Sequence, residues 1–270
     1  MPFFKGMTLD EIDGRVIERY KAEKLDSGLH PKTVNNQLTM LNKMLNLAVE
    51  WRVLTHAPKI KWLKTPEPEF DFLDFEEAAR LIAAATGDTG AMIVIALKTG
   101  MRLGELIALR WEDVDLVAGK INIRRAAARG IVGTPKSGKS REIPLSPEAR
   151  RVLTAHRHLK GEIVFCAESG AMRTKESCKW PLWSACRRAG LRLIGWHKLR
   201  HTFASHLAMR GVPLKAVQEL LGHATIEMTM RYAHLSPAIH RDAVAQLDRP
   251  FQNGHQVGTE CVNAVSEARI

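Results

Sequence analysis

Apolar residues recur at helical spacing through residues 197–222, and glycines divide this run into separate segments. Gly211, followed two residues later by Pro213, ends one helix and starts the next, and Gly222 ends the second helix. The positions expected to face a core are Leu199, Phe203 and Leu207 in the first helix and Leu214, Val217, Leu220 and Leu221 in the second. This pattern predicts short helices that pack on a shared core.

The same stretch of chain concentrates polar residues that bind phosphate or move protons: His197, Arg200, His201, His223 and Tyr232. The first three are spaced i, i+3 and i+4, which places them on one face of a helix. His223 follows the glycine that ends the second helix. Thr225 or Thr229 would open a third helix that carries Tyr232 near its end. We expect each of these residues at an edge or corner that a ligand can reach.

These residue types together suit attack on a phosphodiester by a phenol. The arginine fork bonds two phosphate oxygens and keeps its charge, and histidine moves a proton near neutral pH. A tyrosine has an ordinary pKa of about 10, so it attacks only with help in losing its proton. Taken one at a time, a histidine or a tyrosine is more often structural. The chain has only two tyrosines, and Tyr20 is far from this set in sequence, which makes Tyr232 the candidate nucleophile.

A second polar pair lies upstream, after the apolar run 91–97 and Gly100. A new helix is expected there, with Leu103, Leu106, Ile107 and Arg110 on one face. Arg102 and Glu105, spaced i and i+3, share a different face, where the carboxylate can orient an arginine or a histidine. An isolated pair of this kind is usually a weak surface ion pair.

Two segments with alternating apolar residues, 120–124 and 141–145, predict a hairpin. The segment between them contains a turn over 134–140 with a glycine and the lysines Lys136 and Lys139. A lysine on such a turn can swing over a phosphate and donate a proton. A merely solvated side chain is the default interpretation for Lys139.

Three stretches of sequence carry a family resemblance: TGMRLGELIALRWEDVD, HKLRHTFASHL and LLGHATIEMTMRYAHL. Their wording, order and separation resemble the signature boxes of the tyrosine recombinases, the phage integrase family. The resemblance covers roughly residues 1–248. It implies an enzyme that breaks and rejoins DNA in site-specific recombination of the integration and excision type.

The resemblance also implies a role for each matching residue. Tyr232 is the nucleophile, which attacks a DNA phosphate to give a 3′-phosphotyrosyl intermediate and a free 5′ hydroxyl. Arg102 and Arg200 grip the non-bridging oxygens, and His223 donates a hydrogen bond to the scissile phosphate. The bond energy is kept in the phosphotyrosine, so no cofactor, ATP or metal is needed.

The remaining residues of the implied site handle protons and positions. His197 helps to take the tyrosine proton, and Lys136 protonates the leaving 5′ oxygen. Glu105 positions arginine and histidine side chains of the pocket, and His201 is a secondary, buried member. We therefore expect a catalytic set of Arg102, Lys136, His197, Arg200, His223 and Tyr232, supported by Glu105 and His201.

The expected fold class is mainly α with a small antiparallel β-sheet (α+β), the sheet lying around residues 114–145. Residues 1–65 would form a partial helical core-binding domain that contacts DNA, and residues 66–248 the catalytic domain. A Pro- and Lys-rich linker over 59–68 would join them. Two alternatives stay open for the polar tail, residues 249–270: it is flexible and disordered, or it docks on a neighbouring subunit.

The N-terminal region is expected to form helices over residues 9–20 and 31–51, and Asp74 with Glu77 predicts a capped helix start in the catalytic domain. The second helix resembles part of the family's core-binding domain. Its residues expected to face phosphates are Lys32, Asn35, Asn36 and Lys43. A solvated helix face explains these four residues equally well.

Composition agrees with a nucleic-acid partner. The formal net charge is +11, which predicts salt-sensitive attraction to a polyanion such as double-stranded DNA. The four cysteines have no metal-ligand spacing and fit a reducing, cytoplasmic location, and no apolar run is long enough to cross a membrane. The resemblance implies a homo-tetramer on two synapsed sites, with a monomer when free of DNA.

The resemblance has one departure, because family members usually carry further helices before the segment PFFKGMTLDEID, which here begins directly after Met1. A shortened core-binding domain is expected to bind DNA more weakly. Two other functions therefore stay open. One is a truncated integrase remnant that binds DNA with weak or no recombination, and the other is a relaxing enzyme similar to the type IB topoisomerases.

Overall fold

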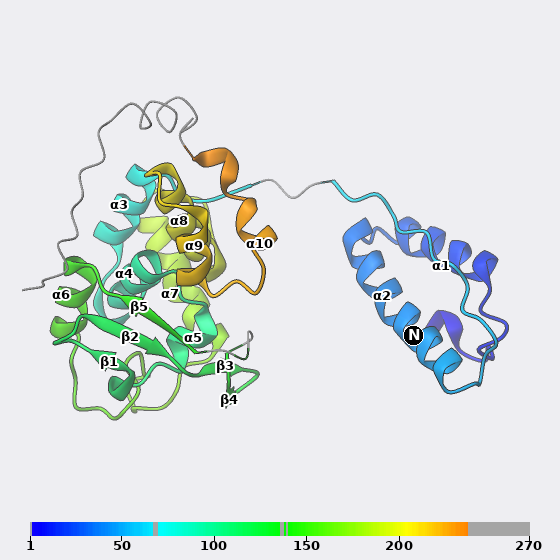
Figure 1. Cartoon of the computed structure of the whole chain (residues 1–270), viewed down its shortest axis with the longest axis horizontal. Helices are drawn as coiled ribbons and strands as arrows, with labels where there is room; N and C mark the ends of the chain where they lie inside the picture. Colours follow the sequence, from blue (N-terminus) through cyan, green and yellow to red (C-terminus); the bar gives the residue numbers. More distant parts are fainter. Residues whose placement is uncertain (1, 67–69, 136–137, 139, 237–270) are drawn as a thin grey trace, which may run out of the picture. The chain divides into compact units, whose positions relative to one another are not determined.

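The computed structural model describes residues 2–66, 70–135, 138 and 140–236 (Figure 1). The chain divides into two compact units, an N-terminal unit, Met1–Phe70, and a C-terminal unit, Asp71–Ile270. Both are mainly helical, and the strands belong to the C-terminal unit. The predicted fold class, mainly α with a small antiparallel sheet, is confirmed.

The N-terminal unit contains the short 3-10 helix η1 (Pro2–Phe4) and two α-helices, α1 (Gly14–Asp26) and α2 (Pro31–Glu50). The expected helix over 9–20 is wrong at both ends. The carboxylate of Asp13 accepts a hydrogen bond from the Val16 backbone N–H at 2.8 Å, so the helix begins after this cap and continues to Asp26. The expected helix over 31–51 matches α2 to within one residue, with Pro31 at its first position.

The core of the N-terminal unit lies between α1 and α2. The apolar residues buried there are Ile12, Ile17, Tyr20, Val34, Leu38, Leu41, Leu45 and Ile60. Asn35 ties the segment after α2 to this helix, because its amide donates to the Leu63 carbonyl at 2.9 Å and its carbonyl accepts from the Leu63 N–H at 3.0 Å. The extended segment after α2 is thus held by side-chain hydrogen bonds.

Helix α4 (Gly87–Thr99) forms the centre of the C-terminal unit. It packs against α3 (Phe75–Ala84), α6 (Pro147–Ala155), α7 (Lys175–Arg188) and α8 (Trp196–Met209), and every residue from Met92 to Leu97 is buried. Such all-round burial explains why its sequence has no polar face. Asp74 and Glu77 form the predicted capping box at the start of α3, with hydrogen bonds of 2.7 and 3.0 Å.

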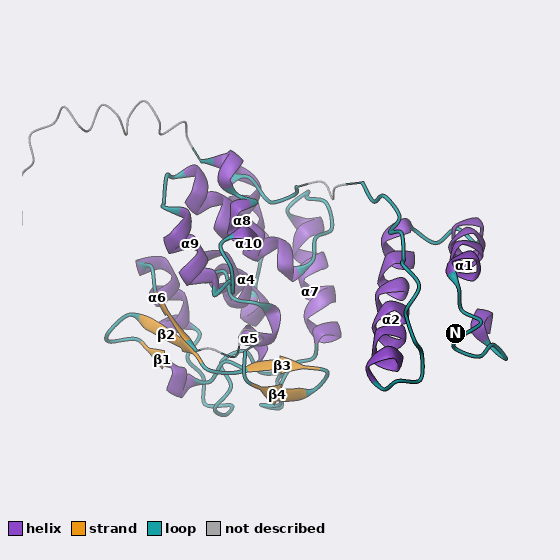
Figure 2. Cartoon of the chain, turned by 45° about the vertical axis from the view of Figure 1, so that its right-hand side comes forward, coloured by secondary structure: helices purple, strands orange, loops and turns teal. Residues whose placement is uncertain are grey.

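The strands that the structure describes, β1 to β5, are short and lie together at one end of the C-terminal unit (Figure 2). Strands β1 (Val114–Asp115), β2 (Lys120–Ile123) and β5 (Arg141–Pro144) form an antiparallel sheet in the order β1-β2-β5, with Ile121 opposite Ile143. The predicted pairing of the 120–124 and 141–145 segments is therefore confirmed. The simple hairpin is wrong, because β3 (Ala126–Ala128) and β4 (Ile131–Gly133) form a second, two-stranded sheet between them.

Two helix boundaries differ from the sequence prediction. Helix α5 (Leu103–Ile107) ends before Arg110, which follows the helix and bridges to Ile163. After α9 (Leu214–Leu221), helix α10 (Glu227–Met230) opens at neither Thr225 nor Thr229, and Tyr232 lies beyond its end. Tyr232 precedes the 3-10 helix η3 (Ala233–Leu235), while η2 (Trp111–Asp113) precedes the first strand. In both cases a polar residue, Arg110 or Tyr232, lies outside the helix in which it was expected, and tertiary contacts set its direction.

Candidate active site

Arg102 and Glu105 meet at the start of α5, as their spacing predicts. Arg102 precedes the helix, and its backbone N–H and its guanidinium both donate to the Glu105 carboxylate, at 2.9 and 3.0 Å. The Glu105 side chain is fully buried, whereas that of Arg102 is partly exposed. The pair is therefore not a surface ion pair, and its carboxylate fixes the direction of an arginine that solvent can reach.

A second arginine, Arg141 at the start of β5, binds the other side of the same carboxylate. Its two terminal nitrogens donate to the two Glu105 oxygens at 2.9 and 2.7 Å. Burial alone raises the pKa of Glu105, but the hydrogen bonds and charges of Arg141, followed by those of Arg102, outweigh burial and lower it. Glu105 is thus an ionised carboxylate between two cations.

Arg200, on α8, is buried to 2% exposure and bonds to two backbone carbonyls. It donates to Gly100 O and Leu221 O, both at 2.7 Å, and so joins the carboxyl ends of α4 and α9. Burial, and next the nearby Arg102, lower the pKa of Arg200 to about 9, so it stays charged at neutral pH. Among the described residues, no carboxylate is hydrogen-bonded to the Arg200 guanidinium, whose partners are backbone carbonyls.

Gly100 makes this arrangement possible. It ends α4 in the left-handed conformation, with φ at 63°, and a Cβ there would lie 2.4 Å from Phe203 Cδ1. Such a contact is too short for any side chain. The glycine therefore lets α8 approach closely enough for Arg200 to reach the Gly100 carbonyl.

Tyr232 is 1% exposed, and its hydroxyl lies 2.6 Å from Nδ1 of His201 on α8. Burial raises the pKa of Tyr232, with Arg231 and Arg200 acting in the opposite direction. Burial, followed by the charge of His197, lowers the pKa of His201 to about 3, so this ring is neutral at pH 7. The tyrosine hydroxyl can donate to Nδ1 when the His201 proton is on Nε2.

His197 and His223 complete the polar surroundings. His197 is an exposed residue, and its ring lies edge-on to that of His201, with ring centroids 4.6 Å apart. Desolvation, then Arg200 and Arg102, lower its pKa. His223 bonds through Nδ1 to the Thr229 hydroxyl at 2.8 Å, and burial, then Arg200 and Arg102, lower its pKa to about 4. Both rings are therefore neutral in a strongly cationic environment.

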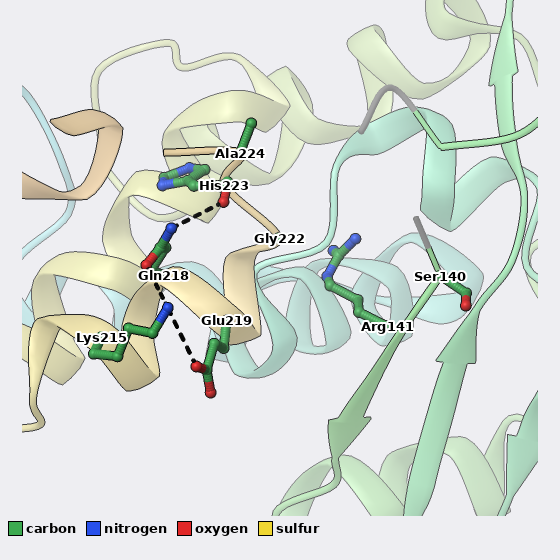
Figure 3. Close-up of a pocket in the computed structure, with 8 residues that line it drawn as sticks. All are labelled: Ser140, Arg141, Lys215, Gln218, Glu219, Gly222, His223 and Ala224. Atoms are coloured by element: carbon green, nitrogen blue, oxygen red, sulfur yellow. Dashed lines mark hydrogen bonds and ion pairs between the residues drawn. The ribbon is translucent and has the colours of Figure 1, made fainter. Parts of the chain in front are cut away.

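A pocket of about 340 Å³ lies beside His223, between α9 and β5 (Figure 3). Its lining residues are Ser140, Arg141, Lys215, Gln218, Glu219, Gly222, His223 and Ala224. Arg141 extends from β5 toward Gly222, and the Gln218 amide donates to the His223 carbonyl at 3.3 Å. The pocket places two cations, Arg141 and Lys215, near one wall of the candidate site.

The C-terminal unit thus brings together five of the six predicted catalytic residues, Arg102, His197, Arg200, His223 and Tyr232, with their supports Glu105 and His201. Lys136, and the neighbouring Lys139, lie outside the described residues, as does the tail over 249–270. The expectation that each polar residue lies where a ligand can reach it is wrong for Arg200 and Tyr232, because both are buried. Among the described residues, the Glu105 carboxylate bonds to Arg102 and Arg141 and to no histidine, so Arg141 takes the place of the predicted histidine.

The predicted DNA-contacting residues lie on α2 of the N-terminal unit. Lys32, Asn36 and Lys43 are exposed there. Asn35 is half-buried and uses its amide to hold Leu63. Lys32, Asn36 and Lys43 can therefore contact a phosphate backbone. Asn35 also has a structural role, because its amide is used to hold Leu63.

Sequence reasoning missed Arg141 as a member of the site. The sequence contained a signal for it. Arg141 is spaced by two residues from Ile143 and by four from Leu145, so it lies on the same, apolar side of the strand. A charged residue at such a position needs a buried partner of opposite sign. Glu105, itself buried, is that partner.

Among the described residues no group of histidine, cysteine, aspartate and glutamate side chains could hold a metal ion. Within the same ranges, no helix combines the length and the apolar character needed to cross a membrane.

Residues 71–238 match the phage integrase family. This region covers every described residue of the C-terminal unit, which carries the candidate site. The chain belongs to the phage integrase family and is a tyrosine recombinase, a member of a class of DNA breaking and rejoining enzymes.

Relatives with similar sequences include integrases of phages. The chain is 30% identical over 254 residues to a putative integrase of Pseudomonas phage Pf1, covering 91% of this chain and 69% of that protein. It is 28% identical over 262 residues to the integrase of Escherichia phage P2, covering 95% of this chain and 70% of the relative. The similarity therefore extends over both units.

Solved structures of recombinases share the fold. The Tn1549 transposon integrase in complex with transposon right end DNA matches with a TM-score of 0.76 at 21% identity, over 90% of this chain and 87% of that one. The catalytic domain of bacteriophage HP1 integrase matches at 32% identity and a TM-score of 0.52, over 68% of this chain and all of that domain. The fold of this chain is thus one that other recombinases use on DNA.

Proposed function

We propose that this protein carries out site-specific recombination by cleaving one DNA strand with Tyr232. The hydroxyl attacks the scissile phosphorus, the bond to the 5′ oxygen breaks, and a 3′-phosphotyrosyl bond and a 5′ hydroxyl result. The proposal rests chiefly on the 2.6 Å contact between the Tyr232 hydroxyl and His201, on the same helix as Arg200. This contact holds the phenol within a set of fixed positive charges, which is where a phosphodiester would bind.

The arginines receive the phosphate in this proposal. Arg102 and Arg200 bind the non-bridging oxygens, and His223 donates a hydrogen bond to one of them. Positive groups fixed by the protein stabilise the charge that develops in phosphoryl transfer without rearranging during the step. Lys136 protonates the leaving 5′ oxygen, and Glu105 supports Arg102.

The two histidines of α8 have different roles in the proposal. A pKa of about 3 makes His201 a poor base, because an effective general base has a pKa near the working pH. His201 therefore holds the hydroxyl in position, and His197, which solvent reaches, assists in removing its proton. Since Tyr232 and Arg200 are both buried, the segment that carries Tyr232 must shift when DNA binds, so that the hydroxyl and the guanidinium reach the phosphate.

The wider proposal concerns DNA and assembly. The N-terminal unit is the core-binding domain, with Lys32, Asn36 and Lys43 facing phosphates, and the C-terminal unit is the catalytic domain. Double-stranded DNA is the substrate, four copies act on two synapsed sites, and the reaction takes place in the cytoplasm. The high positive charge, +11, supports a polyanionic partner.

The chain allows a clean test of the nucleophile, because it has one tyrosine in each unit. The protein is incubated with a pool of randomised duplexes, each with a nick that lets the released fragment diffuse away, and covalent complexes are recovered after denaturation. We expect a covalent adduct with the wild-type protein and with Tyr20→Phe, and none with Tyr232→Phe. Sequencing the recovered duplexes also yields a usable cleavage site.

The same material separates the alternatives. Binding without an adduct in the wild-type protein would support a remnant that lacks catalysis. Relaxation of supercoiled plasmid by monomers, without joining of two sites, would favour activity of the topoisomerase type. An adduct on a residue other than Tyr232 would overturn the proposed mechanism.

A further inference from the structure

We propose that Arg141 is a positioning residue for phosphodiester cleavage, acting through Glu105 and Arg102. The Arg141 side chain is almost fully buried, and it donates hydrogen bonds to Leu220 O and to both Glu105 carboxylate oxygens. Its terminal nitrogens clamp the Glu105 carboxylate, which in turn holds the exposed Arg102. This inference rests on the proposed function, because it assigns Arg102 to the scissile phosphate.

The charges explain why a second arginine is needed. Glu105 is fully buried, and an ionised carboxylate in such a place is stable only when it is paired and hydrogen-bonded. Without Arg141, burial would favour the protonated acid, and a neutral Glu105 would hold Arg102 less firmly. Arg141 thus keeps Glu105 ionised, and Glu105 directs Arg102.

The other side of the same guanidinium supports the second half of the site. Arg141 Nε donates to Leu220 O at 2.9 Å, and the next carbonyl, that of Leu221, accepts from Arg200. Gly222 follows with φ at 63°, and a Cβ there would lie 2.9 Å from Arg141 Cδ. Arg141 therefore fixes the end of α9, which carries the Leu221 carbonyl bonded to Arg200 and is followed by His223. Figure 3 shows Arg141 together with Gly222 and His223 at this end of the helix.

This geometry requires a planar fork. A bidentate bond to a carboxylate and a third bond from Nε can be made at once by arginine but not by lysine, which is a point charge on a flexible stem. The strand contributes the rigidity, because Arg141 pairs with Ile123 in the antiparallel sheet. The fork is thus held on a strand rather than on the neighbouring loop.

The test compares two substrates on one preparation of each variant. The nicked duplex recovered with the wild-type protein is made with an ordinary scissile phosphodiester and with a neutral methylphosphonate at the same position. Single-turnover cleavage of both is measured for Arg141→Met, Arg141→Lys and Arg102→Met. The matched control is Lys120→Met, which removes a cation from the same sheet, where Lys120 pairs with the exposed Glu142 at 2.8 Å.

We expect Arg141→Met to slow cleavage of the phosphodiester about 100-fold, as for the loss of one fixed donor to the reacting group. Cleavage of the methylphosphonate, which carries no charge for Arg102 to neutralise, should slow far less. Arg102→Met should give the same substrate dependence, Arg141→Lys an intermediate one, and Lys120→Met no change. Because both rates come from one preparation, a reduced folded fraction cancels in their ratio.

Equal slowing of the two substrates by Arg141→Met would show a merely structural role and overturn the inference. So would wild-type cleavage of the phosphodiester by that variant, or a wild-type ratio of the two rates in Arg141→Lys. Absence of a Tyr232 adduct in the wild-type protein would instead overturn the proposed function. The two failures are therefore distinguishable in one set of reactions.

Discussion

The two tyrosines of the chain are equally buried, at 1% exposure, but their surroundings differ. Tyr20 lies in the N-terminal unit, where Phe3 and Phe4 pack against its ring and its hydroxyl donates to Gln37 at 2.8 Å. Tyr232 lies against His201 in the C-terminal unit, with Arg231 and Arg200 near enough to act on its pKa. Lys24 also lies over the Tyr20 ring, but this cation is paired with Glu23, whereas Tyr232 adjoins His201 and two arginines.

This comparison shows that burial alone does not distinguish a structural tyrosine from a candidate nucleophile. Burial is the leading cause that raises the pKa of both phenols. The difference lies in what surrounds the hydroxyl: neutral histidines that could accept its proton, and arginines that could bind a phosphate.

The largest effect is expected at the buried cations. Arg200→Lys keeps the charge but cannot span both Gly100 O and Leu221 O, so single-turnover cleavage should fall about 1000-fold. Lys21, 6% exposed in the N-terminal unit, bonds to Glu18 and to Lys61 O. Lys21→Met should reduce the stability of that unit by about 1–3 kcal/mol and leave cleavage at saturating DNA unchanged.

Cleavage is measured with the nicked duplex, and thermal unfolding reports the folded fraction of each variant. A Lys21→Met protein that is fully folded but cleaves as slowly as Arg200→Lys would remove the distinction between the two units. It would show that any buried cation of this chain affects catalysis.

The next effect separates the two histidines that adjoin Tyr232. His197→Ala should slow cleavage about 100-fold, the ordinary contribution of a proton-transferring group. His201→Ala should slow it only about tenfold, because a hydrogen bond that positions the hydroxyl is lost but no base is removed. The rates are compared at several pH values in single-turnover reactions. The reverse order of effects would make His201 the proton acceptor.

Much of this site was predictable because its residues form short sequence motifs. Arg102 and Glu105 are three residues apart, and their contact follows from helix geometry. The α8 helix begins one residue before its expected start, and Gly222 ends α9 as its sequence position predicts. Local spacing is enough to predict a contact when both partners lie within one helical turn, and capping signals are enough to predict where a helix ends.

The rest depends on contacts between distant segments. The bond from His201 to Tyr232 joins residues 31 positions apart, and the bond from Arg141 to Glu105 spans 36. No local propensity fixes such distances. The β3–β4 pair was missed for another reason, since Ala126–Ala128 consists of poor strand formers, and its tight turn uses Arg129 and Gly130 with positive φ.

A smaller effect is expected at matched glycines of the two units. Gly100 and Gly28 both have positive φ, at 63° and 82°, but a Cβ would meet Phe203 only at Gly100. Gly28→Ala should cost about 1 kcal/mol of unfolding free energy from backbone strain alone. Gly100→Ala should cost about 3 kcal/mol, because the clash also displaces α8. Denaturant unfolding measures both, and equal costs would show that α8 can adjust without strain.

The smallest effect is a difference in pH dependence between the units. Burial lowers the pKa of His201 to about 3 and of His223 to about 4, from an ordinary value of 6.5. Their neutral folded forms stabilise the C-terminal unit above pH 6.5, and this stability is lost as the pH falls from 6.5 toward 4, because the unfolded chain binds more protons there. The groups of the N-terminal unit with shifted pKa values, Asp10, Lys24 and Tyr20, have ordinary values outside this range.

Hydrogen exchange within one chain measures this difference. Exchange rates are first corrected for the intrinsic pH dependence of exchange. Between pH 7 and pH 5, the free energy of opening of the α8 amides should then fall by on the order of 2 kcal/mol, while that of the α2 amides should stay the same. The double variant His201→Gln, His223→Gln should reduce the response of α8, because glutamine binds no proton in either state. A smaller response should remain, because burial also lowers the pKa of His197 and His206 on α8. Equal losses in α2 and α8 would mean that the histidines around Tyr232 are not what makes the C-terminal unit sensitive to acid.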